Sequence, residues 1–298
     1  MISNQARKSA SMLIMCEGEN TQDIKVLLLT RSKDSRVWPN ALVFPGGLSE
    51  DVDEQIGREF LEKEQEKPKI EQYLNHLSET SVRYLEWGMS DPVSWYSTLG
   101  TALRETKEEC GIDLCKVSQE HSVQIVGSLN IIAHWLTPNL LKKRYDTFIW
   151  GVQLNHECQD LQVDNVEISQ AKWWGIADAL EAYERTEVDL PVPTLMILSE
   201  LEYLQDQLGS EVSIARLLNI LATTPHSQAI QPIIVKGEGV NLYLPGDQDY
   251  ALHAQQGEQE ANIQREFWKT KTQRLSQKKI QLKSDSKPIV RWYRVMNA

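Results

Sequence analysis

The segment 104–112, with the sequence RETKEECGI, constrains this chain more than any other part of it. On a helix, Glu105, Glu108 and Glu109 stand at i, i+3 and i+4, so their carboxylates share one face. Repulsion between Glu105 and Glu109 destabilises such a helix by a few tenths of a kcal/mol. The helix dipole also disfavours anions in the last turn, which Gly111 is expected to end as a left-handed cap. Pairing of Arg104 with Glu108 at i+4 offsets only part of this cost.

A bound divalent cation would reverse both penalties. Several carboxylates supply the hard oxygen ligands that suit Mg²⁺, an ion that normally keeps some waters and bridges to substrate phosphates. Seen alone, three acids on a helix face are more often a solvated surface than a metal site. The cluster therefore has two interpretations, a solvated face and a metal-dependent phosphate site, until other segments are considered.

Bulk composition excludes several classes of protein. The chain has 298 residues, enough for one large domain with embellishments or for two ordinary ones, and a formal net charge of -11. That charge disfavours nucleic acid and anionic membranes as partners. No apolar run approaches the ~18 residues of a membrane span. Four scattered cysteines without C-x-x-C spacing are typical of reduced thiols in a cytosol-like compartment.

Hydrophobic patterns predict a mixed sheet covered by helices. We expect strands at 11–16, 25–30, 41–44, 123–132, 147–154 and 168–174, and helices at 97–110, from Pro191 onward and at 214–222. Pro45-Gly46-Gly47 should stop the third strand. A hairpin is expected at 233–244, a solvated helix or loop at 257–286 and a last strand at 289–295. The charged stretch around 54–103 is interpreted as a helical insertion.

Two separated segments together resemble the Nudix box, G-x5-E-x7-R-E-U-x-E-E-x-G-U with U aliphatic. The segment 104–112 matches its second half, and Phe44-Pro45-Gly46-Gly47 matches its start, with Asp53 where the box has its first Glu. Thr106 replaces an aliphatic residue, and fifty residues stand where the box has seven. Such an interrupted box resembles the Nudix branch that contains the peroxisomal coenzyme A diphosphatase. Further matches to that branch, in order from about residue 10 to 250, are VLLLTRS at 26–32, WLTP at 135–138, RYDT at 144–147, PII at 232–234 and LPGD at 244–247.

The resemblance implies a metal site. Glu108 and Glu109 would bind Mg²⁺ or Mn²⁺, and Glu105 would be a further ligand or the base that activates water. The Gly46 carbonyl would be another ligand. Glu167 resembles a position where many Nudix enzymes carry an extra ligand or base, although a solvated loop acid is the plainer interpretation.

The resemblance also implies roles for three cationic positions. Arg104 would orient the cluster through a salt bridge with Asp53, which would join the two ends of the insertion. Arg144 is the first choice for contacting a substrate phosphate and Arg31 the second, with solvated loop charge as the alternative for each.

The resemblance therefore implies one Nudix domain over 1–298, an α/β/α sandwich with the insertion at 54–103 and a C-terminal extension at 190–298. The implied reaction is hydrolysis of coenzyme A or acyl-coenzyme A to 3′,5′-ADP and (acyl-)4′-phosphopantetheine. Open alternatives are hydrolysis of ADP-ribose, nucleotide sugars or dinucleoside polyphosphates, and a catalytically silent nucleotide-binding module. The final Met296-Asn297-Ala298 does not resemble a peroxisomal targeting tripeptide, so a cytoplasmic protein is expected. Oligomeric state is left open.

Overall fold

The computed structural model describes two compact units, and each is treated by itself. The large unit comprises Lys8–His134 and Thr147–Gln228, and the small unit comprises Met1–Arg7, Trp135–Asp146 and Ala229–Ala298. The residues that the structure describes are 5–18, 23–35, 38–65, 92–117, 125, 129–139, 141, 143–163, 165–209, 211–223, 229–236 and 240–243.

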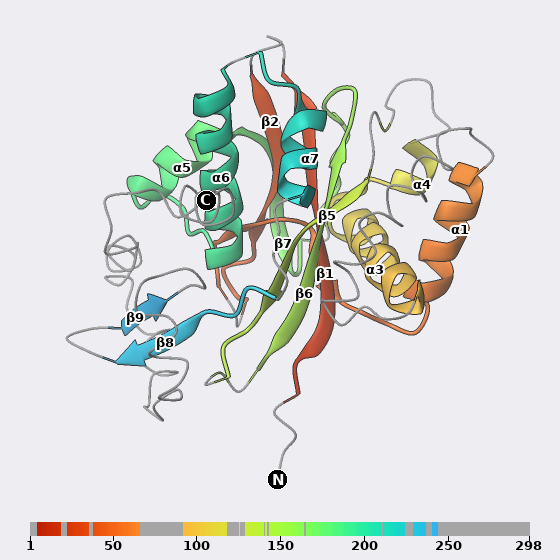
Figure 1. The fold of residues 1–298 in the computed structure, drawn as a ribbon, viewed down its shortest axis with the longest axis horizontal. Coiled ribbons are helices and arrows are strands. Elements are labelled where there is room, and N and C mark those ends of the chain that lie inside the picture. The colour runs from red at the N-terminus through yellow and green to blue at the C-terminus, as the bar shows by residue number, and fades with distance from the viewer. Residues whose placement is uncertain are drawn as a thin grey trace. The chain divides into compact units, whose positions relative to one another are not determined.

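A seven-stranded mixed sheet forms the centre of the fold (Figure 1). Its main path is β3-β2-β1-β6-β5, with β4 paired to β1 and β7 paired to β2. The pairings of β1 with β2 and β4, and of β2 with β3 and β7, are antiparallel. β1 and β6 run parallel, because Arg7 N–H donates to the Arg144 carbonyl at one end (3.0 Å) and Leu154 N–H donates to the Met15 carbonyl at the other (2.8 Å). The strands are β1 (Arg7–Glu17), β2 (Ile24–Arg31), β3 (Leu42–Val43), β4 (Gly46–Leu48), β5 (Asn130–Leu136), β6 (Tyr145–Gln153) and β7 (Ile168–Gly175).

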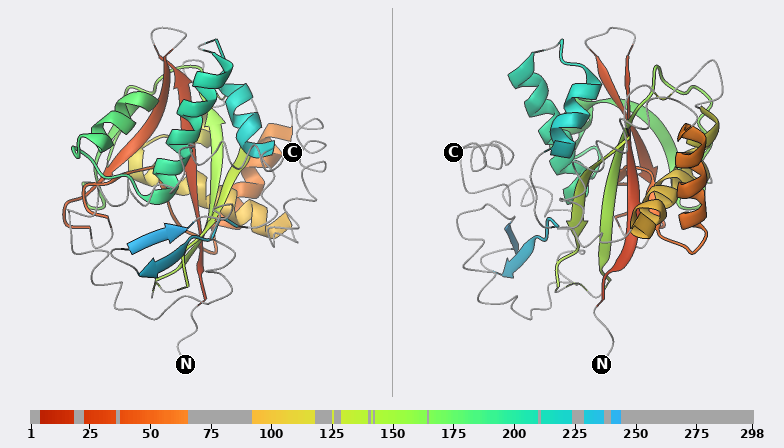
Figure 2. Two further views of the ribbon diagram at one scale, coloured as in Figure 1. Left: turned by 60° about the vertical axis from the view of Figure 1, so that its left-hand side comes forward. Right: turned by 45° about the vertical axis from the view of Figure 1, so that its right-hand side comes forward.

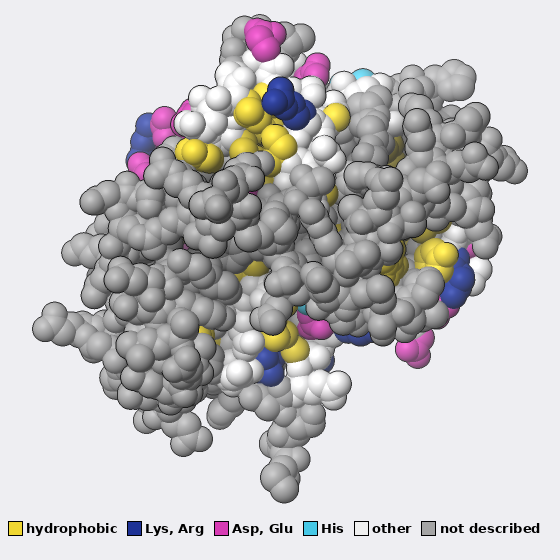
Figure 3. Space-filling model, viewed as in Figure 1, with side chains coloured by type: hydrophobic (Ala, Val, Ile, Leu, Met, Phe, Trp, Pro, Cys, Tyr) yellow, Lys and Arg dark blue, Asp and Glu magenta, His cyan; other side chains and the backbone are white. Residues whose placement is uncertain are grey.

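Helices cover both faces of this sheet in the large unit (Figure 2). α1 (Asp53–Gln65) and α3 (Pro92–Cys110) lie on one face, with the short α4 (Leu114–Val117) after α3. α5 (Ile176–Glu184), α6 (Val192–Leu208) and α7 (Ile214–Thr223) lie on the other. Apolar side chains gather over α7 on the face seen in Figure 3. The predicted α/β/α arrangement is confirmed.

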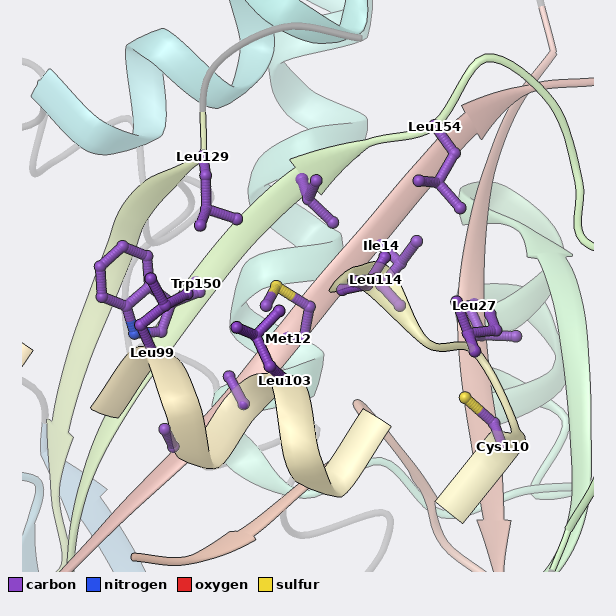
Figure 4. Packing of buried hydrophobic residues seen from close by; sticks show 14 of the residues in the cluster. Met12, Ile14, Leu27, Leu99, Leu103, Cys110, Leu114, Leu129, Trp150 and Leu154 are labelled. Atoms are coloured by element: carbon purple, nitrogen blue, oxygen red, sulfur yellow. The ribbon is translucent and has the colours of Figure 1, made fainter. Parts of the chain in front are cut away.

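Burial explains why the central strands lack a simple alternating pattern. The run from Met12 to Cys16 in β1 and the run from Val26 to Leu29 in β2 are buried throughout, as expected for strands covered on both faces. Leu99, Ala102 and Leu103 of α3 recur at helical spacing and pack onto the sheet beside Met12 and Trp150 (Figure 4). Helix α3 is therefore fixed by its apolar face.

Several expected elements differ from those observed. The helix predicted from residue 97 begins earlier, at Pro92, a residue favoured in the first helical turn. The strand predicted at 123–132 overlaps β5 only at 130–132, because β5 spans Asn130–Leu136; residues 123–124 and 126–128 lie outside the described residues. The predicted stop at Pro45-Gly46-Gly47 is confirmed, because β3 ends at Val43. A separate strand that was not expected, β4 at Gly46–Leu48, then pairs with β1. α5 falls where no helix was expected.

The predicted insertion is helical at both described ends, within α1 and α3, while 66–91 lie outside the described residues. In the small unit, the expected hairpin is present as β8 (Ile233–Lys236) and β9 (Val240–Tyr243). The elements expected at 257–286 and 289–295 lie outside the described residues. None of the helices that the structure describes is long and apolar enough to cross a membrane.

Candidate active site

The three acids of the box occupy the last turns of α3. The helix ends at Cys110, and Gly111 follows with φ +78, the left-handed conformation that favours glycine. Its N–H donates to the Lys107 carbonyl (3.0 Å). The predicted cap is confirmed. Thr106, the departure from the aliphatic pattern, is fully buried and satisfies its hydroxyl by donating to the Ala102 carbonyl (2.6 Å).

Two glycines let strand β4 pass between β1 and the acids of α3. β4 pairs with β1 so that Gly46 faces Ser11, and a Cβ on Gly46 would overlap the Ser11 side chain. A Cβ on Gly47 would overlap the Glu105 carboxylate. Both glycines of the Phe-Pro-Gly-Gly segment are therefore required, because any larger residue would overlap a neighbouring side chain. Glu105 lies directly against the backbone of this strand.

Glu109 is the most buried acid of the cluster. Its side chain is 7% exposed, and its Oε2 accepts a hydrogen bond from Gly46 N–H (2.8 Å). Burial raises the pKa of Glu109 to about 8; the Gly46 hydrogen bond and Arg31 oppose this rise, and Glu105 and Glu167 add to it. Arg31 and Glu167 are thus within electrostatic reach of the box carboxylates, as their predicted roles require.

Arg104 connects the acids to the loop that precedes them. Its Nε and one terminal nitrogen donate to both oxygens of Asp53 (2.8 and 3.2 Å), and that terminal nitrogen also donates to the Leu48 carbonyl (2.9 Å). The other terminal nitrogen donates to Glu105 (2.8 Å) and Glu108 (3.0 Å). The predicted bridge between Asp53 and Arg104 is confirmed, as is the i,i+4 pair with Glu108.

Glu105 and Glu108 differ in their surroundings. Burial raises the pKa of Glu105, while its charge interaction and hydrogen bond with Arg104 lower it. The Glu108 side chain is 58% exposed. Both carboxylates face Arg104, and Glu109 faces Gly46. Accordingly, no group of three His, Cys, Asp or Glu side chains in the described part of the chain is gathered closely enough to hold a metal ion.

The chemistry of the donors nevertheless fits a hard cation. Three carboxylates lie on the last two turns of one helix, and a fourth, Glu167, is within electrostatic reach of Glu109. The negative charges of Glu105 and Glu167 both act to raise the pKa of Glu109. The ligand set of Glu105, Glu108, Glu109, Gly46 and Glu167 remains a prediction.

The remaining predicted residues fall in different units. Arg31, at the end of β2, donates from Nε and a terminal nitrogen to Ser35 Oγ (3.3 and 3.0 Å). Glu167 is tied to the same loop, because its carbonyl accepts from Ser32 N–H (2.8 Å). Arg144 belongs to the small unit, where its Nε donates to the Thr137 carbonyl (3.0 Å). The large unit therefore gathers every predicted site residue except Arg144.

Two polar side chains next to the site were not anticipated from the sequence. Thr101 and Ser49 lie 2.8 Å apart, and Thr101 also contacts Asp53. Thr101 stands three residues before Arg104, on the same side of the helix. That spacing is the one signal that could have identified it.

The fold and this cluster resemble those of the Nudix pyrophosphohydrolases. The chain is similar to the acyl-coenzyme A diphosphatase of Xenopus laevis, with 26% identity over 282 residues that cover 78% of this chain and 72% of that protein. The resemblance to the Nudix superfamily, and within it to the coenzyme A diphosphatase branch, is confirmed.

Other comparisons add likenesses of fold. No family model matches the chain. A NUDIX hydrolase from Alicyclobacillus acidocaldarius matches with a TM-score of 0.45 and 19% identity, over 66% of this chain and 90% of that one. The NUDIX domain of Shewanella oneidensis NrtR, solved with ADP ribose, matches with a TM-score of 0.38 and 14% identity, over 69% and 90%. Both TM-scores are below 0.5, and neither likeness bears on the activity of this chain.

Proposed function

We propose that this protein hydrolyses the diphosphate of coenzyme A or acyl-coenzyme A, with Mg²⁺ or Mn²⁺ as cofactor, to 3′,5′-ADP and (acyl-)4′-phosphopantetheine. The observation that carries the proposal is the arrangement of Glu105, Glu108 and Glu109 at the Phe-Pro-Gly-Gly turn, with Arg104 and Gly46 N–H as their anchors. The similarity to an acyl-coenzyme A diphosphatase supports the choice of substrate.

We expect the acids to have the following roles in metal binding and proton transfer. Glu108 and Glu109 would hold the cation, together with the Gly46 carbonyl and Glu167, and Glu105 would be a further ligand or the base that takes a proton from water. When bound, a divalent cation activates the attacking water and neutralises charge on the leaving phosphate oxygen. Arg104 donates to both Glu105 and Glu108 and so holds their carboxylates next to each other, where they would bind the cation.

Arg31 supplies a cation for the substrate at the same end of the sheet. Two hydrogen bonds to Ser35 hold its guanidinium, and its charge reaches Glu109. A fixed guanidinium binds phosphate through charge-assisted hydrogen bonds and loses little freedom in doing so. In a protein of net charge -11, such a group provides the local attraction that a polyanion needs.

The test is a mass-spectrometric screen of diphosphate compounds against the full chain, with Mg²⁺ and separately with Mn²⁺. Coenzyme A and acetyl-coenzyme A should yield 3′,5′-ADP, and ADP-ribose, a nucleotide sugar and a dinucleoside polyphosphate should be cut more slowly. A preference for one of the latter would replace the substrate and keep the chemistry. Binding of coenzyme A without turnover, with either metal, would mean a silent nucleotide-binding module.

A further inference from the structure

Helices α1 and α3 pack antiparallel at the two ends of the interruption in the box. A Cβ on Gly100 of α3 would overlap the backbone carbonyl of Asp53, and a Cβ on Gly57 of α1 would overlap that of Tyr96. These two close contacts fix how α1 and α3 are aligned along each other. Asp53 lies beside Gly100, and Gly57 lies one helical turn further from the acids. The backbones of both helices therefore approach as closely as glycine allows, and the side chain that follows Gly100 faces the start of α1.

That side chain is Thr101, which is fully buried. Its Oγ1 lies 2.8 Å from Asp53 Oδ2, 2.8 Å from Ser49 Oγ and 2.8 Å from the Ser97 carbonyl. A hydroxyl has one hydrogen to donate, so Asp53 and the Ser97 carbonyl share it while Ser49 can donate to Oγ1. Thr101 thus joins the loop before α1, the first residue of α1 and the backbone of α3.

Asp53 transmits this contact to the acids. Its side chain is also fully buried, and Oδ2 accepts from Glu50 N–H (2.8 Å) as well as contacting Thr101. Asp53 then holds Arg104 through both oxygens, and Arg104 holds Glu105 and Glu108. Two box acids are thus oriented through a buried carboxylate, and on the side of Asp53 away from Arg104 its Oδ2 is held by the Thr101 hydroxyl and Glu50 N–H.

We propose that Thr101 is a positioning residue for the reaction: its hydroxyl fixes Asp53, and through Arg104 it sets the geometry of Glu105 and Glu108. The inference rests on the proposed function, because it takes these acids to be the metal ligands. Thr101 lies among the positions that the box motif leaves unspecified.

Thr98 provides a matched control on the same helix. It is also fully buried, and its hydroxyl donates within its own helix, to the Trp95 carbonyl (3.2 Å). Replacing either threonine by valine removes a buried hydroxyl from α3 at nearly constant volume. The two variants differ in whether Asp53 loses a partner.

The experiment compares Thr101→Val, Thr101→Ser and Thr98→Val in the full chain. Mn²⁺ affinity of the substrate-free protein is measured by electron paramagnetic resonance, together with kcat, KM at saturating Mn²⁺ and the thermal midpoint. Partners that orient metal ligands typically change affinity or activity by about 10–100-fold when lost. Thr101→Val should weaken Mn²⁺ binding and lower kcat by roughly tenfold or more with little change in KM, while Thr101→Ser keeps the hydroxyl and both values.

Thr98→Val should lose a similar amount of thermal stability and keep its Mn²⁺ affinity. Equal Mn²⁺ affinities in Thr101→Val and Thr98→Val would overturn the proposal, as would a Thr101→Ser variant as impaired as Thr101→Val. If Thr101→Val does not fold, Ser49→Ala tests the same network from the loop and should weaken Mn²⁺ binding, whereas unchanged affinity would again overturn the proposal. Failure of the unmodified protein to bind Mn²⁺ would instead refute the proposed function.

Discussion

At the scale of single residues, Arg104 carries the largest share of the site's contacts. Burial lowers the pKa of this guanidinium, but hydrogen bonds and charges from Asp53 and Glu105 outweigh burial and raise it, so Arg104 stays charged at any working pH. Asp53 is fully buried and takes two of the donors. The pair is thus a buried ion pair, whose partners are each costly to leave alone.

We predict that Arg104→Ala destabilises the protein by about 3–5 kcal/mol, because it leaves Asp53 as a buried, uncompensated charge. Arg185→Ala is the control: Arg185 also forms an i,i+4 pair, with Glu181 at 2.7 Å, but both side chains are exposed. That change should cost at most about 1 kcal/mol. Urea unfolding of both variants measures the difference, and equal losses would show that the buried bridge is no stronger than a surface pair.

We predict that Glu108→Gln and, separately, Glu109→Gln lower kcat by roughly 10²–10⁴ and leave the fold intact. Without metal, both variants should melt at the same temperature as the unmodified protein or slightly above it, because repulsion among the acids falls. Glu59→Gln, on the exposed side of α1, is the control and should keep full activity. More than a tenth of the original activity in both variants would refute the metal cluster.

At the scale of elements, the sequence predicted those strands and helices that have a periodic pattern of apolar residues. Strands β1, β2 and β7 and helices α3, α6 and α7 follow apolar runs or helical spacing, and the structure contains them within a few residues. β4 has no such pattern, because Gly46 and Gly47 contribute no side chains. It exists because the long β1 offers hydrogen-bonding partners to it. α5 follows Gly175, which cannot cap a helix with a side chain, so its start had no signal.

In the candidate site, too, some contacts could be predicted from the sequence and others could not. The clamp from Arg104 to Asp53 could be predicted because the box motif specifies both positions. The contacts of Thr101 and Ser49 could not, because they depend on how closely α1 approaches α3 at Gly100. Contacts across an interruption of this length are set by tertiary packing, which one sequence does not reveal.

α6 contains an acid whose titration should affect stability. Glu200 shares the helix face of the buried Ile197 and Leu204, and burial raises its pKa from 4.5 to about 7. The folded protein thus holds this proton more tightly than the unfolded chain does, so the contribution of Glu200 is most favourable below pH 4.5 and is lost as the pH rises to about 7.

We predict that Glu200→Gln reduces the loss of stability between pH 4.5 and about 7. At pH 8 the variant should be more stable than the unmodified protein by about 1–3 kcal/mol, and near pH 4.5 the two should be nearly equal. Asp206→Asn, at an exposed position of the same helix, is the control and should show no such trend. Thermal melts from pH 4.5 to pH 8 measure it; a stability difference that does not grow with pH would contradict the assignment.

At the scale of the whole molecule, the proposed substrate is a polyanion, whereas the net charge of the chain is -11. The large unit contributes Arg31, whose charge acts on the cluster itself. Arg144 belongs to the small unit and is the residue immediately before β6. Coenzyme A carries a 3′-phosphate in addition to its diphosphate, so two cations with separate tasks would suit it better than one.

We predict that Arg31 and Arg144 recognise different phosphates of coenzyme A. Arg31, beside the acids, should serve the diphosphate, and Arg144 should serve the 3′-phosphate, since phosphate recognition favours charge-assisted hydrogen bonds. We expect kcat/KM for coenzyme A to exceed that for 3′-dephospho-coenzyme A, and Arg144→Ala to shrink this ratio by lowering the first value alone. Arg31→Ala should lower both values together and leave their ratio unchanged. Steady-state kinetics of the two substrates with each variant measure these ratios. If the dephospho compound is cut equally well, the enzyme does not recognise the 3′-phosphate and the coenzyme A assignment fails, whereas the carboxylate chemistry on α3 would remain.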